Sequence, residues 1–138
     1  MNTNYLVLCL RIAGGMHAGL FCAGLAMPRA VQLSRHLATL PAFVRRLFWV
    51  YYTFIGMCLI GFGLLTLVFA DKLATGGGLT RALCAFLALF WLLRFIVALF
   101  VLDVRPYLTN WRWRVGYHAT NFVFSLLPVI YAWAALRP

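Results

Sequence analysis

Four long apolar stretches, separated by short polar segments, dominate the sequence. They cover residues 5–27, 42–70, 79–102 and 115–136. An α-helix rises about 1.5 Å per residue, so roughly 20 apolar residues cross the hydrocarbon core of a bilayer. Each stretch is long enough to do so. The pattern predicts an all-α integral membrane protein in which residues 1–138 form one four-transmembrane-helix bundle.

The segments between the stretches contain the residues that end or begin helices. Pro28 closes the first stretch, and Pro41 suits the first turn of the second, where its missing N–H is not needed. Three successive glycines at 76–78 predict a short hairpin between the second and third stretches. A signal peptide is the competing interpretation of the first stretch. Residues 1–4 carry no Lys or Arg, so we expect a retained helix.

Composition supports the membrane interpretation. Hydrophobic residues make up 65% of the chain and charged residues only 10%, whereas about a quarter of a soluble domain is charged. A water-soluble enzyme, a disordered chain and a disulfide-stapled secreted domain are therefore excluded. The 12 Lys+Arg outnumber the 2 Asp+Glu, but they lie between or at the ends of the apolar stretches, so nucleic acid is not an expected partner.

The basic residues are distributed unequally between the two sides of the predicted bundle. The first and third loops hold seven of them: Arg29, Arg35, Arg45, Arg46, Arg105, Arg112 and Arg114. The opposite side holds three: Lys72, Arg81 and Arg137. The positive-inside rule then predicts cytoplasmic first and third loops, with both termini on the outer, periplasmic side. The preference for Arg over Lys and the short loops favour the inner (cytoplasmic) membrane of a bacterium.

Membrane lipids, especially anionic ones, are the first partners that these loops predict. We expect Arg45, Arg46, Arg105, Arg112 and Arg114 to contact lipid headgroups. The first loop also has leucines at roughly helical spacing between its polar residues, which predicts a short amphipathic segment on the cytoplasmic surface. A plain basic connector is the alternative.

Polar residues inside the apolar stretches define a candidate binding pocket. Arg94 lies deep in the third stretch, and the chain has no Glu; its acids, Asp71 and Asp103, lie at stretch ends. Arg94 must therefore bind helix carbonyls, water or an anion from outside the chain. On the fourth stretch, His118, Asn121 and Ser125 share one helical face with Arg114. Together with His17 and Arg94, these three residues are the candidate cofactor-binding set, in the cytoplasmic half of the bundle. Interhelical hydrogen bonds with no ligand are the alternative.

The chemistry of this set is limited. His17 and His118 lie at different predicted depths, which disfavours a haem ligated by both, but a haem with one ligand or a quinone stays open. No cluster of Cys, His and carboxylates predicts a metal site, and no catalytic motif or paired carboxylates are present. Small residues predict close helix packing, either within the chain or on a partner: Gly14, Gly15 and Gly19 in the first stretch, and Gly56, Gly61 and Gly63 in the second.

These observations favour a small, non-catalytic integral membrane subunit of a larger complex, with other integral membrane subunits as partners. A haem- or quinone-binding redox module is the first alternative. A binder or carrier of lipids or small anions is the second.

Overall fold

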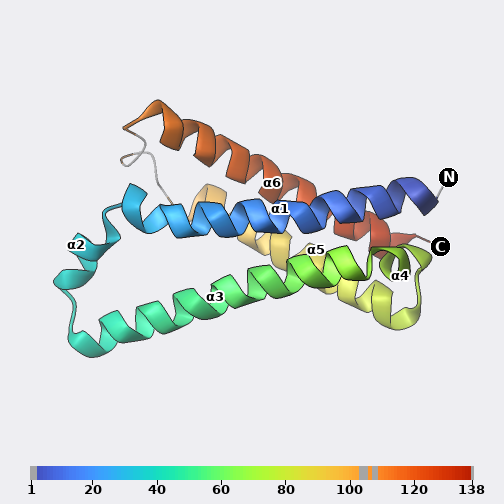
Figure 1. Cartoon of the computed structure of the whole chain (residues 1–138), viewed down its shortest axis with the longest axis horizontal. Helices are drawn as coiled ribbons and strands as arrows, with labels where there is room; N and C mark the ends of the chain where they lie inside the picture. Colours follow the sequence, from blue (N-terminus) through green and yellow to red (C-terminus); the bar gives the residue numbers. More distant parts are fainter. Residues whose placement is uncertain (1–2, 103–105, 107–108, 138) are drawn as a thin grey trace.

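The computed structural model of the chain describes residues 3–102, 106 and 109–137. Four long helices are present among them: α1 (Thr3–Ala30), α3 (Ala42–Val68), α5 (Gly78–Phe100) and α6 (Trp111–Leu136). Each is long and apolar enough to cross a membrane. Two short helices, α2 (Leu33–Ala38) and α4 (Ala70–Thr75), precede and follow α3 (Figure 1). The predicted all-helical architecture with four candidate membrane spans is therefore confirmed for the described residues.

The sequence did not predict α4. The predicted second stretch ends at Ala70, which is the first residue of α4. The helix direction changes at Phe69, and α4 then packs against α1. Ala70, Leu73 and Ala74 are buried in that contact, so the turn gains apolar packing that a straight continuation of α3 would lack. Gly76 ends α4 with a φ of 73°, a left-handed conformation that glycine adopts without a steric penalty.

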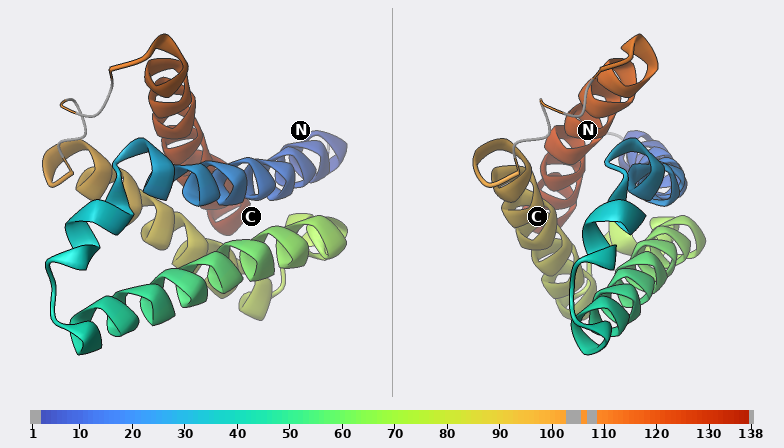
Figure 2. Two further views of the ribbon diagram at one scale, coloured as in Figure 1. Left: turned by 60° about the vertical axis from the view of Figure 1, so that its left-hand side comes forward. Right: turned by 90° about the vertical axis from the view of Figure 1, so that its left-hand side faces the viewer.

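The long helices pack as two antiparallel pairs. α1 lies along α3, α5 lies along α6, and α1 also contacts α6 and so joins the pairs (Figures 1 and 2). The guanidinium Nη2 of Arg137, just after α6, donates a hydrogen bond to the hydroxyl of Thr3 at 3.0 Å. The start of α1, the end of α6 and α4 thus lie at one end of the bundle, which we call the α4 end. The opposite end is the α2 end.

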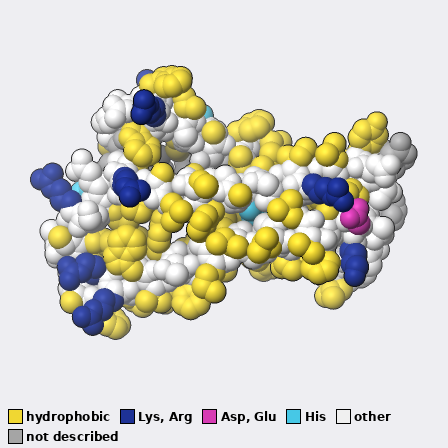
Figure 3. Space-filling model, viewed as in Figure 1, with side chains coloured by type: hydrophobic (Ala, Val, Ile, Leu, Met, Phe, Trp, Pro, Cys, Tyr) yellow, Lys and Arg dark blue, Asp and Glu magenta, His cyan; other side chains and the backbone are white. Residues whose placement is uncertain are grey.

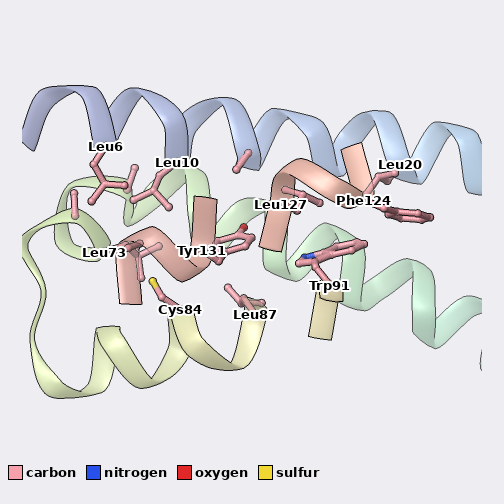
Figure 4. Packing of buried hydrophobic residues seen from close by; sticks show 14 of the residues in the cluster. Leu6, Leu10, Leu20, Leu73, Cys84, Leu87, Trp91, Phe124, Leu127 and Tyr131 are labelled. Carbon is pink, nitrogen blue, oxygen red and sulfur yellow. The ribbon is translucent and has the colours of Figure 1, made fainter. Parts of the chain in front are cut away.

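Nearly all the core lies in the half of the bundle next to the α4 end (Figure 4). In α1 the last buried residue is Leu20, and in α6 the first is Phe124. α3 has only two buried residues among its 27, Gly63 and Thr66, and both lie near its α4 end. Side chains of α1, α4, α5 and α6 interdigitate here into a single apolar cluster.

Toward the α2 end, α3 and α6 diverge from α1 (Figures 1 and 2). α3 has no buried residue before Gly63, and α6 has none before Phe124. α1 and α3 stay in touch in this half through the Tyr52 hydroxyl, which donates to the Gly24 carbonyl, and through the Phe21 ring beside Gly56. We call the two parts of the bundle the closed half, next to α4, and the open half, next to α2.

Two glycines allow the close approach of α1 and α3. A Cβ atom on Gly63 would lie 2.9 Å from the Cβ of His17 and 3.3 Å from the carbonyl oxygen of Gly14. A Cβ on Gly14 would meet the Leu67 side chain at 2.5 Å. Gly15, Gly19 and Gly61, which the sequence also pointed to, have no neighbour within 4 Å of such an atom. Of the glycines that the sequence predicted for close packing, the described chain therefore uses Gly14 and Gly63 between α1 and α3, and not Gly15, Gly19 or Gly61.

We expect Gly63→Ala to lower the free energy of unfolding by about 1–3 kcal/mol, because the added methyl group overpacks a backbone contact. Gly61→Ala is the matched control. It lies on the same helix with open space beside it, so we expect it to leave stability unchanged or slightly raised. Thermal unfolding in detergent measures both variants. Equal destabilisation by the two would contradict the role assigned to Gly63.

Candidate functional site

His17, near the middle of α1, is the buried polar centre of the closed half. Its side chain is 1% exposed. Its Nδ1 lies 2.7 Å from the carbonyl oxygen of Ala13, one turn earlier on the same helix. A carbonyl only accepts hydrogen bonds, so Nδ1 carries a proton, and in the neutral ring Nε2 presents a lone pair. Within the described part of the chain, this buried Nε2 has no hydrogen-bond partner.

Two aromatic rings enclose His17. Trp91 of α5 meets it edge to face, with ring centroids 5.1 Å apart, and Tyr131 of α6 lies at 6.2 Å. Both rings are buried, and they point into the middle of the cluster (Figure 4). Gly63 of α3 closes the remaining side through its contact with the His17 Cβ. The imidazole therefore lies at the point where the four long helices meet.

A hydrogen bond links α3 to α6 beside this centre. The Thr66 hydroxyl donates to the Phe62 carbonyl at 2.7 Å, so it accepts from the Tyr131 hydroxyl, also at 2.7 Å. Both side chains are fully buried. In a low-dielectric interior, an unpaired hydroxyl costs more than the bond contributes, so the two groups stabilise the fold as a unit.

Arg94 of α5 lies on the outside of this centre. Its side chain is exposed, and its guanidinium carbon lies 5.5 Å from the centroid of the Phe124 ring. Phe124 in turn stacks on Trp91, with centroids 5.7 Å apart and planes at 28°. A continuous row therefore runs from Arg94 through Phe124 and Trp91 to His17. Among the described residues, one ion pair is found, in which Asp71 lies 3.3 Å from Arg11.

The other predicted site residues, His118, Asn121 and Ser125, all lie on α6. His118 is exposed, and its ring contacts Tyr117 with centroids at 5.5 Å. Asn121 and Ser125 are half-buried, and the Ser125 hydroxyl donates to the Phe122 carbonyl of its own helix at 2.8 Å. The interactions described for this chain include no direct contact between any two members of the candidate set. Its role as a single pocket stays a prediction.

Trp91, Tyr131 and Thr66 belong to the buried centre but were missed from the sequence. Each lies in an apolar stretch where an aromatic ring or a threonine is ordinary core composition. The sequence offered one indication for Trp91 alone. It lies one turn before Arg94 on the same helix, so the two side chains are neighbours. Residue spacing within one helix does not reveal which other helix each side chain contacts, because that depends on the tertiary structure.

The described members of the predicted headgroup set lie at the α2 end. Arg45, Arg46, Arg112 and Arg114 are all exposed, and Arg105 lies outside the described residues. On the face drawn in Figure 3, Lys and Arg side chains gather at the two ends of the molecule, with an apolar surface between them. This distribution matches a bilayer, whose polar layers flank a hydrocarbon core.

Two shallow cavities lie at the α4 end. One of about 180 Å³ is lined by Thr3, Thr75 and Arg137, among others, and one of about 350 Å³ lies beside Arg11 and Asp71. Neither touches the candidate set. No group of three or more His, Cys, Asp or Glu in the described ranges is placed to hold a metal ion.

Comparison with protein-family models, curated proteins and solved structures finds no match to this chain. Its class therefore rests on its own helices. Four candidate membrane spans make it a multi-pass, all-helical membrane protein.

We expect Thr66→Val to lower the free energy of unfolding by about 1–2 kcal/mol, because it leaves the buried Tyr131 hydroxyl unpaired. Thr53→Val is the matched control, since the Thr53 hydroxyl is exposed and bonds only the Trp49 carbonyl of its own helix. Adding Tyr131→Phe to Thr66→Val should recover part of the loss in a double-mutant cycle. Full additivity of the two substitutions would show that their hydroxyls do not interact.

Proposed function

We propose that this protein is a small, non-catalytic subunit of a larger membrane complex, and that partner subunits pack against its open half. The observation that carries the proposal is the contrast between the two halves. The closed half buries side chains from all four long helices, whereas α3 and α6 bury none over their α2-end segments.

The physical argument rests on what drives packing in a bilayer. Lipid tails are as apolar as the helix surfaces, so transmembrane helices associate through van der Waals packing and hydrogen bonds. Helices that diverge over half their length forgo these contacts within the chain. Neighbouring transmembrane helices of comparable size restore them, which supports a protein partner as the occupant of the open half.

Contact with anionic lipid is a second candidate role, favoured by the exposed arginines at the α2 end. Each basic residue near an anionic surface contributes about 1 kcal/mol of attraction. This role is compatible with membership of a complex, because the arginines lie at the ends of the helices rather than along them.

The haem or quinone alternative has less support. His17 offers a free Nε2, but Trp91, Tyr131 and Gly63 pack around its ring. A haem or quinone at Nε2 would have to separate these helices. His118 is accessible, but of the described residues only Tyr117 makes a ring contact with it. A visible absorption spectrum of protein purified from its native membrane distinguishes this alternative.

The subunit proposal predicts a partner at the open half and none at the closed half. Phe54 and Leu65 are both exposed, lie on nearly the same face of α3, and are about 16 Å apart along the helix. With a photo-crosslinking amino acid at either position in native membranes, we expect a protein adduct from position 54 and none from 65. Native mass measurement should place the wild-type chain in an assembly. A monomer with lipid adducts alone at both positions would overturn the proposal.

The lipid role makes its own prediction. Anionic lipid should stabilise the delipidated protein more than zwitterionic lipid does, and Arg45→Gln/Arg46→Gln should reduce that difference by about 1–2 kcal/mol. Lys72→Gln/Arg81→Gln removes the same charge at the α4 end and serves as the control. If the two double variants lose the difference equally, total charge rather than these two arginines decides lipid binding.

A further inference from the structure

Arg94 lies well inside a candidate membrane span. α5 has 23 residues, and Arg94 is six residues before its last residue and sixteen after its first. At 1.5 Å per residue, its Cα is about 9 Å from the nearer end of the helix and about 24 Å from the other. Its side chain is exposed on the bundle surface. A charged group at this depth facing hydrocarbon costs several kcal/mol unless it is paired.

The guanidinium of Arg94 rests on an aromatic ring of the neighbouring helix. It lies over Phe124 of α6, whose ring stacks on Trp91, one turn toward the N-terminus of α5. Side chains in an α-helix also lean toward the helix N-terminus. Both points favour a guanidinium held against the rings of the bundle over one extended to the closer headgroup layer, as snorkelling would require.

No carboxylate of the described chain pairs with Arg94. Asp71 lies at the α4 end and pairs with Arg11. The only other acid in the sequence, Asp103, follows the end of α5 and lies outside the described residues. A second copy of the chain brings only the same two acids. In a parallel symmetric membrane dimer equivalent residues share one depth, so the Asp71 of a second copy lies at the α4 end and not opposite Arg94.

We propose that Arg94 docks a carboxylate carried by a membrane-spanning helix of a different protein; this inference rests on the proposed function and names the chemistry of the partner. Phe124 supports the guanidinium from one side, and a guanidinium over a ring keeps its in-plane N–H donors available. A carboxylate accepts two of these donors in a bidentate pair, which strengthens in low dielectric. A lipid phosphate is the less suitable occupant, because Arg94 lies six residues before the end of α5 and its guanidinium is held against Phe124.

The test uses the full chain in vesicles of zwitterionic lipid and a synthetic Leu/Ala transmembrane peptide with one glutamate in its central turns. A second peptide has glutamine at that position. Energy transfer between labelled protein and peptide measures association. We expect the wild-type protein to prefer the glutamate peptide roughly tenfold or more, as a charged hydrogen-bonded pair requires. Arg94→Leu should bind both peptides equally, and Arg94→Lys should show a reduced preference because it lacks the bidentate fork.

Arg11→Leu removes another exposed arginine of a long helix and should keep the preference. Equal binding of both peptides by the wild type, or an unchanged preference in Arg94→Leu, would overturn the proposal. Vesicles containing anionic lipid supply the remaining arm. Loss of the wild-type preference there would assign Arg94 to anionic headgroups, whereas its retention supports the carboxylate. These vesicles contain no native complex, so the peptide test is independent of the crosslinking test. Crosslinking at position 54 together with equal binding of both peptides would support the subunit proposal and overturn only the carboxylate proposal for Arg94.

Discussion

The close approach of α1 and α3 at Gly14 and Gly63 is the constraint on which the rest of the structure depends. It places the backbone of α3 against the Cβ of His17, so the imidazole extends into the space shared with α5 and α6. Trp91 and Tyr131 then pack on the imidazole, and Tyr131 bonds Thr66 back on α3. One pair of glycines thus allows four helices to share a single buried polar centre. In a bilayer, where hydrophobic burial does not drive association, such close packing carries most of the stability.

The same constraint explains why the bundle closes over only one half. α4 adds buried side chains at its own end, and Arg137 joins Thr3 there. Toward the α2 end, α1 and α3 keep contact through Tyr52 and Gly56, while the start of α6 diverges from α1. In the proposed complex, the closed half would keep the fold while the open half, where α3 and α6 bury no residues, would receive a partner.

Arg94 connects these two features physically. Through Phe124 and Trp91 its guanidinium rests on the rings that enclose His17. A partner carboxylate at Arg94 would therefore be held by a rigid, well-packed support rather than by a flexible side chain alone. Pre-positioned donors of this kind lose little entropy on binding, which favours a specific pair over general attraction to anions.

The sequence by itself determined the class of the protein and the number of candidate spans, because 20-residue apolar runs with few charges have few stable arrangements other than membrane helices. It also singled out Arg94 and His17 as polar residues in apolar surroundings. Only the tertiary structure decided what they meet. Gly14, rather than Gly15, faces α3, α4 turns back at Phe69, and Trp91 and Tyr131 surround His17. Spacing along one helix tells which residues share a face, but the rotation of that helix against its neighbours depends on side-chain packing across helices, which are distant in sequence.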